Sequence, residues 1–432
     1  MSTVTVVQAA RKYGDFYVPR FEIMASGVGV NAGVLRDVSQ VTYNDSITEI
    51  DSFDLTVANW DTDPKKRTFK YVGAEATVKG SSPQERLFNP CAGEFELKLG
   101  YGGELATLMK GSTTSLEPSF PAGGAPTLTV RVLNALHKLR GKQHRDHWPN
   151  KRVGEGQMKI SRIAQDIGER RIDGEAFPLP IRINKEAMAK EPLLDYLAQD
   201  NVFDIDFLLL EARKIGYAVY VDLESKGREV KEVLVFGPSD ARHEGVPRTT
   251  YELEWGISLI DFAPKLSTAN QVKSVSVKSW DRQKNKAIVE KVDLHDPGIT
   301  TNADLLELLD VPGCRPREEV VASEPMRTPA QARRRAQALL SEKLKTMVEG
   351  SGTTVGLPDL RAGLQVLIKG LGARFSGVFF VTKTTHTLND SGYITKFTAR
   401  REAPLPASGL AAAAGAAAGA GAGVAAGAGA AS

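Results

Sequence analysis

The sequence is poor in cysteine, and neither Cys91 nor Cys314 is part of a CxxC pair. A disulfide framework and a cysteine zinc site both need more cysteines at closer spacing, so the sequence contains neither. A single long-range bridge between the two remains open. So little cysteine is typical of a protein from a reducing compartment.

The sequence also lacks an excess of charge of either sign. Its 55 Lys and Arg residues oppose 52 Asp and Glu residues, which gives a formal net charge of +3. This balance argues against binding to nucleic acid or to an anionic membrane surface, since either partner would require a basic face on the protein. The basic clusters 65–67 and 333–335 are therefore predicted to be solvated faces.

Neither end of the chain contains a run of large apolar residues. The N-terminal "MSTVTVVQAARKYGDF" lacks the apolar stretch and cleavage site of a secretory signal, so none is expected. Residues 403–432 carry no charge and are almost wholly Ala and Gly after Gly409. Ala and Gly gain little from transfer into lipid, and each Gly weakens a helix by about 1 kcal/mol relative to Ala. We expect a disordered, flexible tail and no membrane span.

Strand patterns dominate both halves of the sequence. In "VTYNDSITEIDSFDLTVANWD" the residues Ile50, Phe53, Leu55 and Val57 alternate with polar ones, with one break in register, and "TFKYVGAEATVKG" and "GEFELKLGYGG" repeat this period between glycine turns. The period returns in "TYELEWGISLIDF", "QVKSVSVKSWD", "LQVLIKG", "GVFFVTKTTHTL" and "GYITKFTARR". Short, evenly spaced strands predict a sandwich or barrel in each half.

Helical periodicity is confined to the middle of the chain and to one later segment. After a Pro/Gly linker that ends at Pro126, the sequence predicts a strand at 127–132, a helical segment directly after it, and a hairpin of "YAVYVD" and "EVLVFG". Three further helices are predicted here. The first has an apolar face of Met158, Ile160, Ile163, Ala164 and Ile167 and is closed by Gly168. The second is at Leu193, Leu194 and Leu197, and the third is capped by Asp204 or Asp206 and ended by Gly216.

The clearest predicted helix covers residues 328–348. Thr328 suits the N-cap, Pro329 the first position and Gln331 the third position of a capping box, and Gly350 is expected to end the helix.

Few residues point to chemistry. Gly370 and Gly372 begin a near-match to a dinucleotide loop, but Phe375 stands where a third glycine is needed, so we predict a turn between strands. His144, Asp146 and His147 are suitable ligand types for zinc or iron, yet they lack an i, i+4 histidine pair and are interpreted as a surface loop. His386 is predicted to make a structural hydrogen bond on a strand. We therefore predict no catalytic, cofactor-binding or metal-binding residue.

Three stretches together resemble a known family. They are "LEPSFPAGGAPTLTVRVLNALHKLRGKQ", "DYLAQDNVFDIDFLLLEARKIGYAVYVD" and "GLPDLRAGLQVLIKGLGARFSGVFFVTKTTHTLNDSGYITKFTARRE". The third is the most specific, through Gly356, Pro358, Leu360, Arg361, Gly363, Gly370, Gly372, Phe375, Ser376, Gly377, His386, Gly392, Tyr393 and Phe397. The chain resembles, over about residues 20–402, the baseplate hub proteins of contractile phage tails and tail-like injection systems, which are the late control D family and the N-terminal part of VgrG spike proteins.

The resemblance implies a mixed α+β, mostly β fold, with two tube-like antiparallel β-barrel domains and small α/β modules inserted between them. The expected divisions are an N-terminal β-barrel at 1–125 with 249–268 as its candidate completion, an α/β module at 126–248, a second β-barrel at 269–402 that contains the helix 328–348, and the Ala/Gly tail at 403–432.

The resemblance also implies a structural role without enzymatic activity or cofactor. A homotrimer would join the six-fold inner tube to a three-fold spike in a virion tail or tail-like particle baseplate, assembled in the bacterial cytoplasm. Its expected partners are the inner tube protein, a separate spike protein, the baseplate wedge and other tail proteins, with DNA or protein as lumen cargo. A tail-associated cell-wall hydrolase and another tail or baseplate structural protein are the alternatives.

Overall fold

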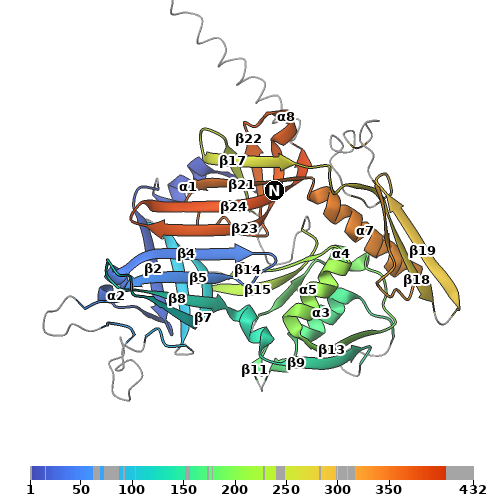
Figure 1. Cartoon of the computed structure of the whole chain (residues 1–432), viewed down its shortest axis with the longest axis horizontal. Helices are drawn as coiled ribbons and strands as arrows, with labels where there is room; N and C mark the ends of the chain where they lie inside the picture. The colour runs from blue at the N-terminus through green and yellow to red at the C-terminus, as the bar shows by residue number, and fades with distance from the viewer. Residues whose placement is uncertain are drawn as a thin grey trace, which may run out of the picture.

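The computed structural model describes residues 2–14, 16–61, 69–72, 87–90, 93–102, 104–150, 156–172, 175–177, 179–226, 229–239, 249–281, 284–297, 299, 309 and 317–404. Cys91, Cys314, the basic cluster 65–67 and the Ala/Gly tail from residue 405 lie outside the described residues. The chain is mixed α+β and mostly β, which confirms the predicted fold class (Figure 1).

The first β region is an antiparallel sheet. In sheet order it contains β4 (Val38–Ser46), β5 (Ser52–Ala58), β8 (Thr127–Asn134), β7 (Leu105–Ser119), β6 (Glu94–Tyr101), β2 (Pro19–Ala25) and β3 (Val28–Gly29), with the short helix α2 (Ala32–Asp37) before β4. The alternation predicted for β5 is confirmed, because Phe53, Leu55 and Val57 are fully buried in one core.

The second β region contains both parallel and antiparallel pairs. Its strands are β1 (Ser2–Thr5), β16 (Thr249–Glu254), β22 (Gln365–Lys369), β23 (Gly377–Asn389), β24 (Gly392–Pro404), β21 (Val348–Val355) and β17 (Leu259–Leu266), with helices α1 (Val6–Tyr13) and α8 (Gly372–Phe375). The pairs β1–β16 and β16–β22 are parallel, so this region is not antiparallel throughout. All other pairs in it are antiparallel.

One strand joins the two β regions into a single sheet. The first part of β23 pairs with β22, and its later residues, 383–389, pair with residues 40–46 of β4. Figure 1 shows β23 lying directly beside β4, with β24 on the other side of β23. Within residues 249–268, the candidate completion of the first region, β16 pairs with β22 and β17 pairs with β21. The division into domains remains a prediction.

An α/β module leaves the first region after β8. It contains the 3-10 helix η2 (Ala135–Arg140), β9 (Gln143–Trp148), α3 (Ile160–Gly168), β10 (Arg171–Ile172), β11 (Glu175–Ala176), β12 (Ile181–Ile183), α4 (Lys185–Ala189), β13 (Leu197–Phe203), α5 (Asp204–Lys214), β14 (Ala218–Lys226) and β15 (Glu229–Gly237). The predicted helix up to Gly168 and the β14–β15 hairpin are confirmed, although the helix begins at Ile160, so Met158 lies before it. Apolar faces of α3 and α5 share one core with β14 and β15.

Two helix predictions in this module are wrong. The helix predicted at Leu193–Leu197 is absent, because the N–H and C=O of Leu194 bond to the C=O and N–H of Met158 at 2.7 and 2.9 Å and are not free for a helix. The short helix α4 lies earlier, capped by Asn184. Neither predicted aspartate caps α5, since Phe203 occupies the N-cap. The side chain of Asp204 is bonded to Arg170 and Gln199 instead.

A separate sheet, of β18 (Val272–Asp281), β19 (Lys286–Asp293) and β20 (Arg317–Val321), packs against helix α7 (Pro329–Lys345). Val275, Val277 and Ile288 share a core with alanines of α7. Figure 1 shows this sheet at one end of the molecule, with α7 between it and the α/β module. Within the described ranges, no helix has the length and apolarity to cross a bilayer.

The predicted ends of α7 are partly right. Thr328 accepts a hydrogen bond from the N–H of Gln331 at 3.2 Å, so it is the cap as predicted. The side chain of Gln331 accepts from the N–H of Arg327 at 3.0 Å, so the capping box is not formed. The helix ends at Lys345, with Thr346 as its C-cap. Gly350 does not end the helix as predicted, since it is part of β21. A Cβ at Gly350 would lie 2.6 Å from the ring of Phe262 on β17, so this glycine permits close strand packing.

Candidate functional site

A buried arginine links the two β regions. Arg361 lies in the loop between β21 and β22 and is only 4% exposed. Its Nε donates to Asp45 Oδ2 at 3.0 Å and its Nη2 donates to the hydroxyl of Tyr43 at 2.6 Å. The N–H of Ala362 also donates to Asp45 Oδ2 at 3.0 Å. A loop of the second region is thereby bonded to β4 of the first.

Three more carboxyl groups surround this arginine. Asp51, between β4 and β5, accepts from Asn134 Nδ2 at 2.8 Å and from the N–H of Ser46. Asp222 on β14 is 7% exposed, and Glu232 on β15 accepts from the N–H of Lys110 at 2.9 Å. We call Tyr43, Asp45, Asp51, Asp222, Glu232 and Arg361 the polar junction. It joins both β regions to the hairpin of the α/β module.

Burial controls protonation in the polar junction. It raises the pKa of Asp222 to about 6 and the pKa of Glu232 to about 7, while Arg361 opposes both shifts. It also holds the pKa of Asp51 well above its usual range, with a further contribution from Asp45. One guanidinium faces four carboxyl groups, so protons on some of them relieve the repulsion near neutral pH.

His386 supports the same loop from β23. Its Nε2 lies 2.9 Å from the carbonyl oxygen of Leu360 and its Nδ1 lies 2.8 Å from the hydroxyl of Tyr393. Because a carbonyl only accepts, Nε2 carries the proton and Nδ1 accepts from Tyr393. Burial lowers the pKa of His386 to about 3, so the ring is neutral. This confirms the predicted structural hydrogen bond.

Glycines let the loop approach its neighbours closely. Gly363 has φ +87°, and a Cβ there would lie 2.2 Å from the ring of Tyr220 on β14. Only glycine combines this backbone conformation with this contact. The loop from 356 to 364 therefore packs tightly onto the module as well as onto β4.

The near-fingerprint at Gly370 forms a corner between strands. Gly370 has φ +82°, and the four-residue helix α8 separates β22 from β23. A dinucleotide loop opens onto a longer helix whose N-terminus faces the phosphates. This segment returns directly into a strand, as predicted for a turn.

The histidine-rich stretch is on β9, not on a loop as predicted. His144 Nδ1 lies 3.1 Å from Asp204 Oδ2, and Asp146 accepts from Arg170 Nη2 at 2.9 Å. His147 points to the other side of the strand and stacks on Tyr196 at 6.2 Å between ring centroids. Throughout the described ranges, no three His, Cys, Asp or Glu side chains converge as metal ligands.

The basic cluster 333–335 is not a solvated face as predicted. Arg335 is bonded to Glu324, and Arg333 lies 3.5 Å from Asp296. Arg334 lies over the ring of Tyr217 at 5.7 Å. Each of these three α7 residues therefore has a partner outside the helix.

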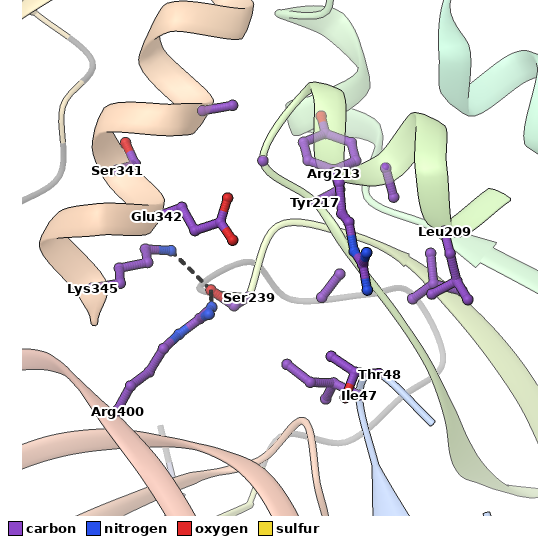
Figure 2. Close-up of a pocket in the computed structure, with 15 residues that line it drawn as sticks. Ile47, Thr48, Leu209, Arg213, Tyr217, Ser239, Ser341, Glu342, Lys345 and Arg400 are labelled. Carbon is purple, nitrogen blue, oxygen red and sulfur yellow. Dashed lines mark hydrogen bonds between the residues drawn. The ribbon is translucent and has the colours of Figure 1, made fainter. Parts of the chain in front are cut away.

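A small cavity of about 120 Å³ lies where β4, α5, α7 and β24 meet (Figure 2). Figure 2 shows Lys345 and Arg400 directed at Ser239, whose Oγ lies 2.9 and 3.3 Å from their nitrogens. Leu209 and Ile47 contribute its apolar side. These contacts connect α7 and β24 to the residues that follow β15, so the cavity is part of the packing between the regions.

The β regions expose apolar side chains and strand edges that suit assembly. Among the described residues, β17 pairs only with β21 and β1 only with β16. Exposed apolar side chains on or beside these regions are Val7, Tyr17, Val18, Val28, Trp255, Ile257 and Ile260, with Tyr17 at 83% and Ile257 at 76%. Exposed apolar residues next to unpaired strand edges are typical of association surfaces.

The sequence interpretation missed the polar junction. A usable signal was present on β4, where Asp45 continues the inward alternation of Val41 and Tyr43. β14 gives no such alternation, because residues 219–222 are all buried. A carboxylate at an inward strand position needs a buried partner. The partner, Arg361, lies more than 300 residues from Asp45 and cannot be paired with it by local pattern.

A family model described as the Alg8 N-terminal domain matches residues 17–390. No curated protein matches the chain. Among solved structures, the chain is similar to the 43 kDa tail protein of prophage MuSo2 from Shewanella oneidensis, with a TM-score of 0.58, 13% identity, and coverage of 89% of this chain and 98% of that chain.

Two further solved structures are similar over the same share of this chain. A tail protein from Neisseria meningitidis has a TM-score of 0.56 at 14% identity, with 89% and 97% of the two chains covered. An Escherichia coli component of the type VI secretion system, described as structurally similar to phage T4 tail proteins, has a TM-score of 0.50 at 13% identity, with 89% and 77% covered. The chain thus has the fold of these proteins.

Proposed function

We propose that this chain, which belongs to the family of the Alg8 N-terminal domain, is the structural baseplate hub of a contractile tail or tail-like injection particle. The observation that supports this most is the fold, shared over 89% of this chain with almost the full length of a prophage tail protein. Its contribution is architecture and assembly, not catalysis.

In this proposal, three copies form a closed ring. Each copy supplies two β regions side by side, so the trimer presents six to an inner tube while its own symmetry matches a three-fold spike. The exposed apolar side chains and the edges of β1 and β17 provide surface for contacts between copies. Permanent assemblies of this kind bury more than about 2,000 Å² per interface.

The polar junction suits this role because it fixes the angle between the two β regions. Arg361 and the N–H of Ala362 hold β4 through Asp45, and His386 holds the same loop through Leu360. A ring closes only when each copy has the same shape, so an internal lock favours closure. The proposed partners are the inner tube protein, the spike protein and the baseplate wedge.

Electron cryo-microscopy of tail particles from the source strain tests the proposal. We expect density that fits this chain, in three copies, between the inner tube and the spike. Particles that lack the chain, or that carry it elsewhere, would contradict the hub role. Clearing of peptidoglycan in a zymogram of the purified chain would favour the cell-wall hydrolase instead.

A further inference from the structure

A groove of about 390 Å³ lies between the α/β module and the segment that leads into α7. One wall is formed by the chain around Leu194 and Leu197 and by the C-terminal end of α5. The opposite wall is the stretch from Ser323 to Arg327 together with the first turns of α7. The groove has more than three times the volume of the cavity in Figure 2.

Both walls are held in place by hydrogen bonds, so the groove is preformed. The N–H of Met326 donates to Ser279 Oγ at 2.8 Å, which fixes one wall to β18. Leu194 is bonded on both sides to Met158 in the other wall. Arg335 Nη1 donates to the carbonyl of Arg213 at 3.1 Å and connects the two walls at one end.

The interior of the groove is apolar, and its own charges are mostly paired. Glu324 receives two bonds from Arg335, at 2.7 and 2.6 Å, and Glu211 receives one from Lys214 at 2.6 Å. Arg327 is the exception at the rim, since it has no carboxylate within ion-pair distance among the described residues. Its guanidinium lies 4.9 Å from the ring centroid of Tyr196.

The apolar surface continues beyond the groove. Leu193, 47% exposed, directly precedes the wall residue Leu194, and Tyr196 is 42% exposed at the rim. Leu210, 52% exposed, lies one helical turn before Lys214 on α5. These exposed apolar side chains add to the apolar lining of the groove, and an extended chain can contact several of them at once.

We propose that this groove docks a polypeptide segment of a partner protein that carries a large apolar side chain beside a carboxylate. The apolar side chain enters between Leu197 and Met326, and the carboxylate binds Arg327 over the ring of Tyr196. Removing apolar surface from water favours the first contact, and the rim cation without a carboxylate favours the second. The proposal does not depend on the hub role.

The test is a fluorescence titration of the full chain with 8-anilinonaphthalene-1-sulfonate, which combines an apolar body with one anionic group. We expect one bound dye per chain. Arg327→Glu should weaken binding by about tenfold or more, which corresponds to about 1.4 kcal/mol. Ala198→Trp, at an exposed position on the wall, should block the dye without disturbing the core.

Lys278→Glu is the matched control. Like Arg327, Lys278 is an exposed cation near an exposed aromatic residue, since it lies on the same face of β18 as the half-exposed Trp280, but it does not line the groove. It should leave dye binding unchanged. Absence of a single dye site, or equal loss in Arg327→Glu and Lys278→Glu, would overturn the proposal.

Displacement of the dye distinguishes a polypeptide from a small anion. The peptide acetyl-Asp-Leu-Phe-Asp-amide should displace the dye, and its Lys-Leu-Phe-Lys counterpart should do so at least about tenfold less well, because its charges repel Arg327. If the dye binds but neither peptide displaces it, the groove takes a small amphipathic anion, and the polypeptide assignment is wrong.

Discussion

The polar junction and the groove are two boundaries within one chain, and they are built in opposite ways. The polar junction is closed around buried charge, with Arg361 4% exposed and Asp45 1% exposed. The groove is open, and its ion pairs lie at its edge. A boundary filled by buried, bonded charge holds its parts in one arrangement, whereas an open boundary with fixed walls leaves surface for another molecule.

The largest expected effect comes from removing the cation of the polar junction. Arg361→Met leaves Asp45 buried without its partner, and we expect a loss of about 3–5 kcal/mol in the free energy of unfolding. Urea unfolding followed by circular dichroism measures it. Arg131→Met is the control, since its pair with Asp54 is half-exposed and should contribute about 0–1 kcal/mol. Equal losses in both variants would contradict a buried lock.

The pH dependence of stability tests the carboxyl groups of the polar junction. The pKa values of Asp222 and Glu232 are raised to about 6 and 7 in the folded state, so the folded chain binds more protons than the unfolded chain between about pH 4 and 7. These two groups should therefore lower the free energy of unfolding as pH rises through this window, by about 3 kcal/mol each, and no further above it. His386, whose pKa burial lowers to about 3, acts in the opposite direction below about pH 6.5.

Asp222→Asn and Glu232→Gln should remove the contribution of these two groups, so the double variant should lose less stability than the wild-type chain as pH rises from about 4 to 7. Other charged or titratable groups also act on these two carboxyl groups: Tyr43, Asp45, Asp51 and Arg361 in the polar junction, and Lys110 and Glu94 near Glu232. A variant that changes both carboxyl groups at once therefore gives the clearest difference from the wild-type chain. Urea unfolding at a series of pH values gives the slope. A slope that is unchanged in the double variant would contradict the assignment.

Gly363→Ala tests how tightly the loop is packed onto the module. The added Cβ is strained by the positive φ and clashes with the ring of Tyr220, so we expect a loss of about 2–4 kcal/mol in the free energy of unfolding. Gly27→Ala is the matched control, because Gly27 has φ +80° but no atom within 4 Å of the added Cβ. It should lose only about 1–2 kcal/mol, the cost of the backbone conformation. Thermal unfolding of both variants shows whether the difference exists.

The smallest expected effect is at the edge of the groove. Glu324→Gln removes a partly exposed pair with Arg335, and we expect a change of about 0–1 kcal/mol in the free energy of unfolding. Urea unfolding next to Arg361→Met gives the comparison. A loss as large as that of Arg361→Met would show that both boundaries depend on charge in the same way.

Local pattern predicted most of the strands and the two longest helices. The alternation in β5 and the N-cap at Thr328 each depend only on neighbours within a few residues, so both can be predicted from the local sequence. The helix predicted around Leu194 failed because the backbone bonds of that residue go to Met158, a contact that helical periodicity does not encode.

The polar junction could not be predicted in the same way. Its members come from β4, the β4–β5 connection, β14, β15 and the loop before β22, and only the folded sheet brings them together. Arg361 and Gly363 were found through the family resemblance, which gave them no role. The close approach of Tyr220 to Gly363 and of Tyr43 to Arg361 supplies that role.

The mass of the purified full chain in solution tests the hub proposal most directly. We expect a homotrimer with three times the 46.7 kDa of one chain, and a three-fold ring in electron micrographs. A chain that stays monomeric at micromolar concentration by light scattering, and that forms no ring when the spike protein is added, would contradict it.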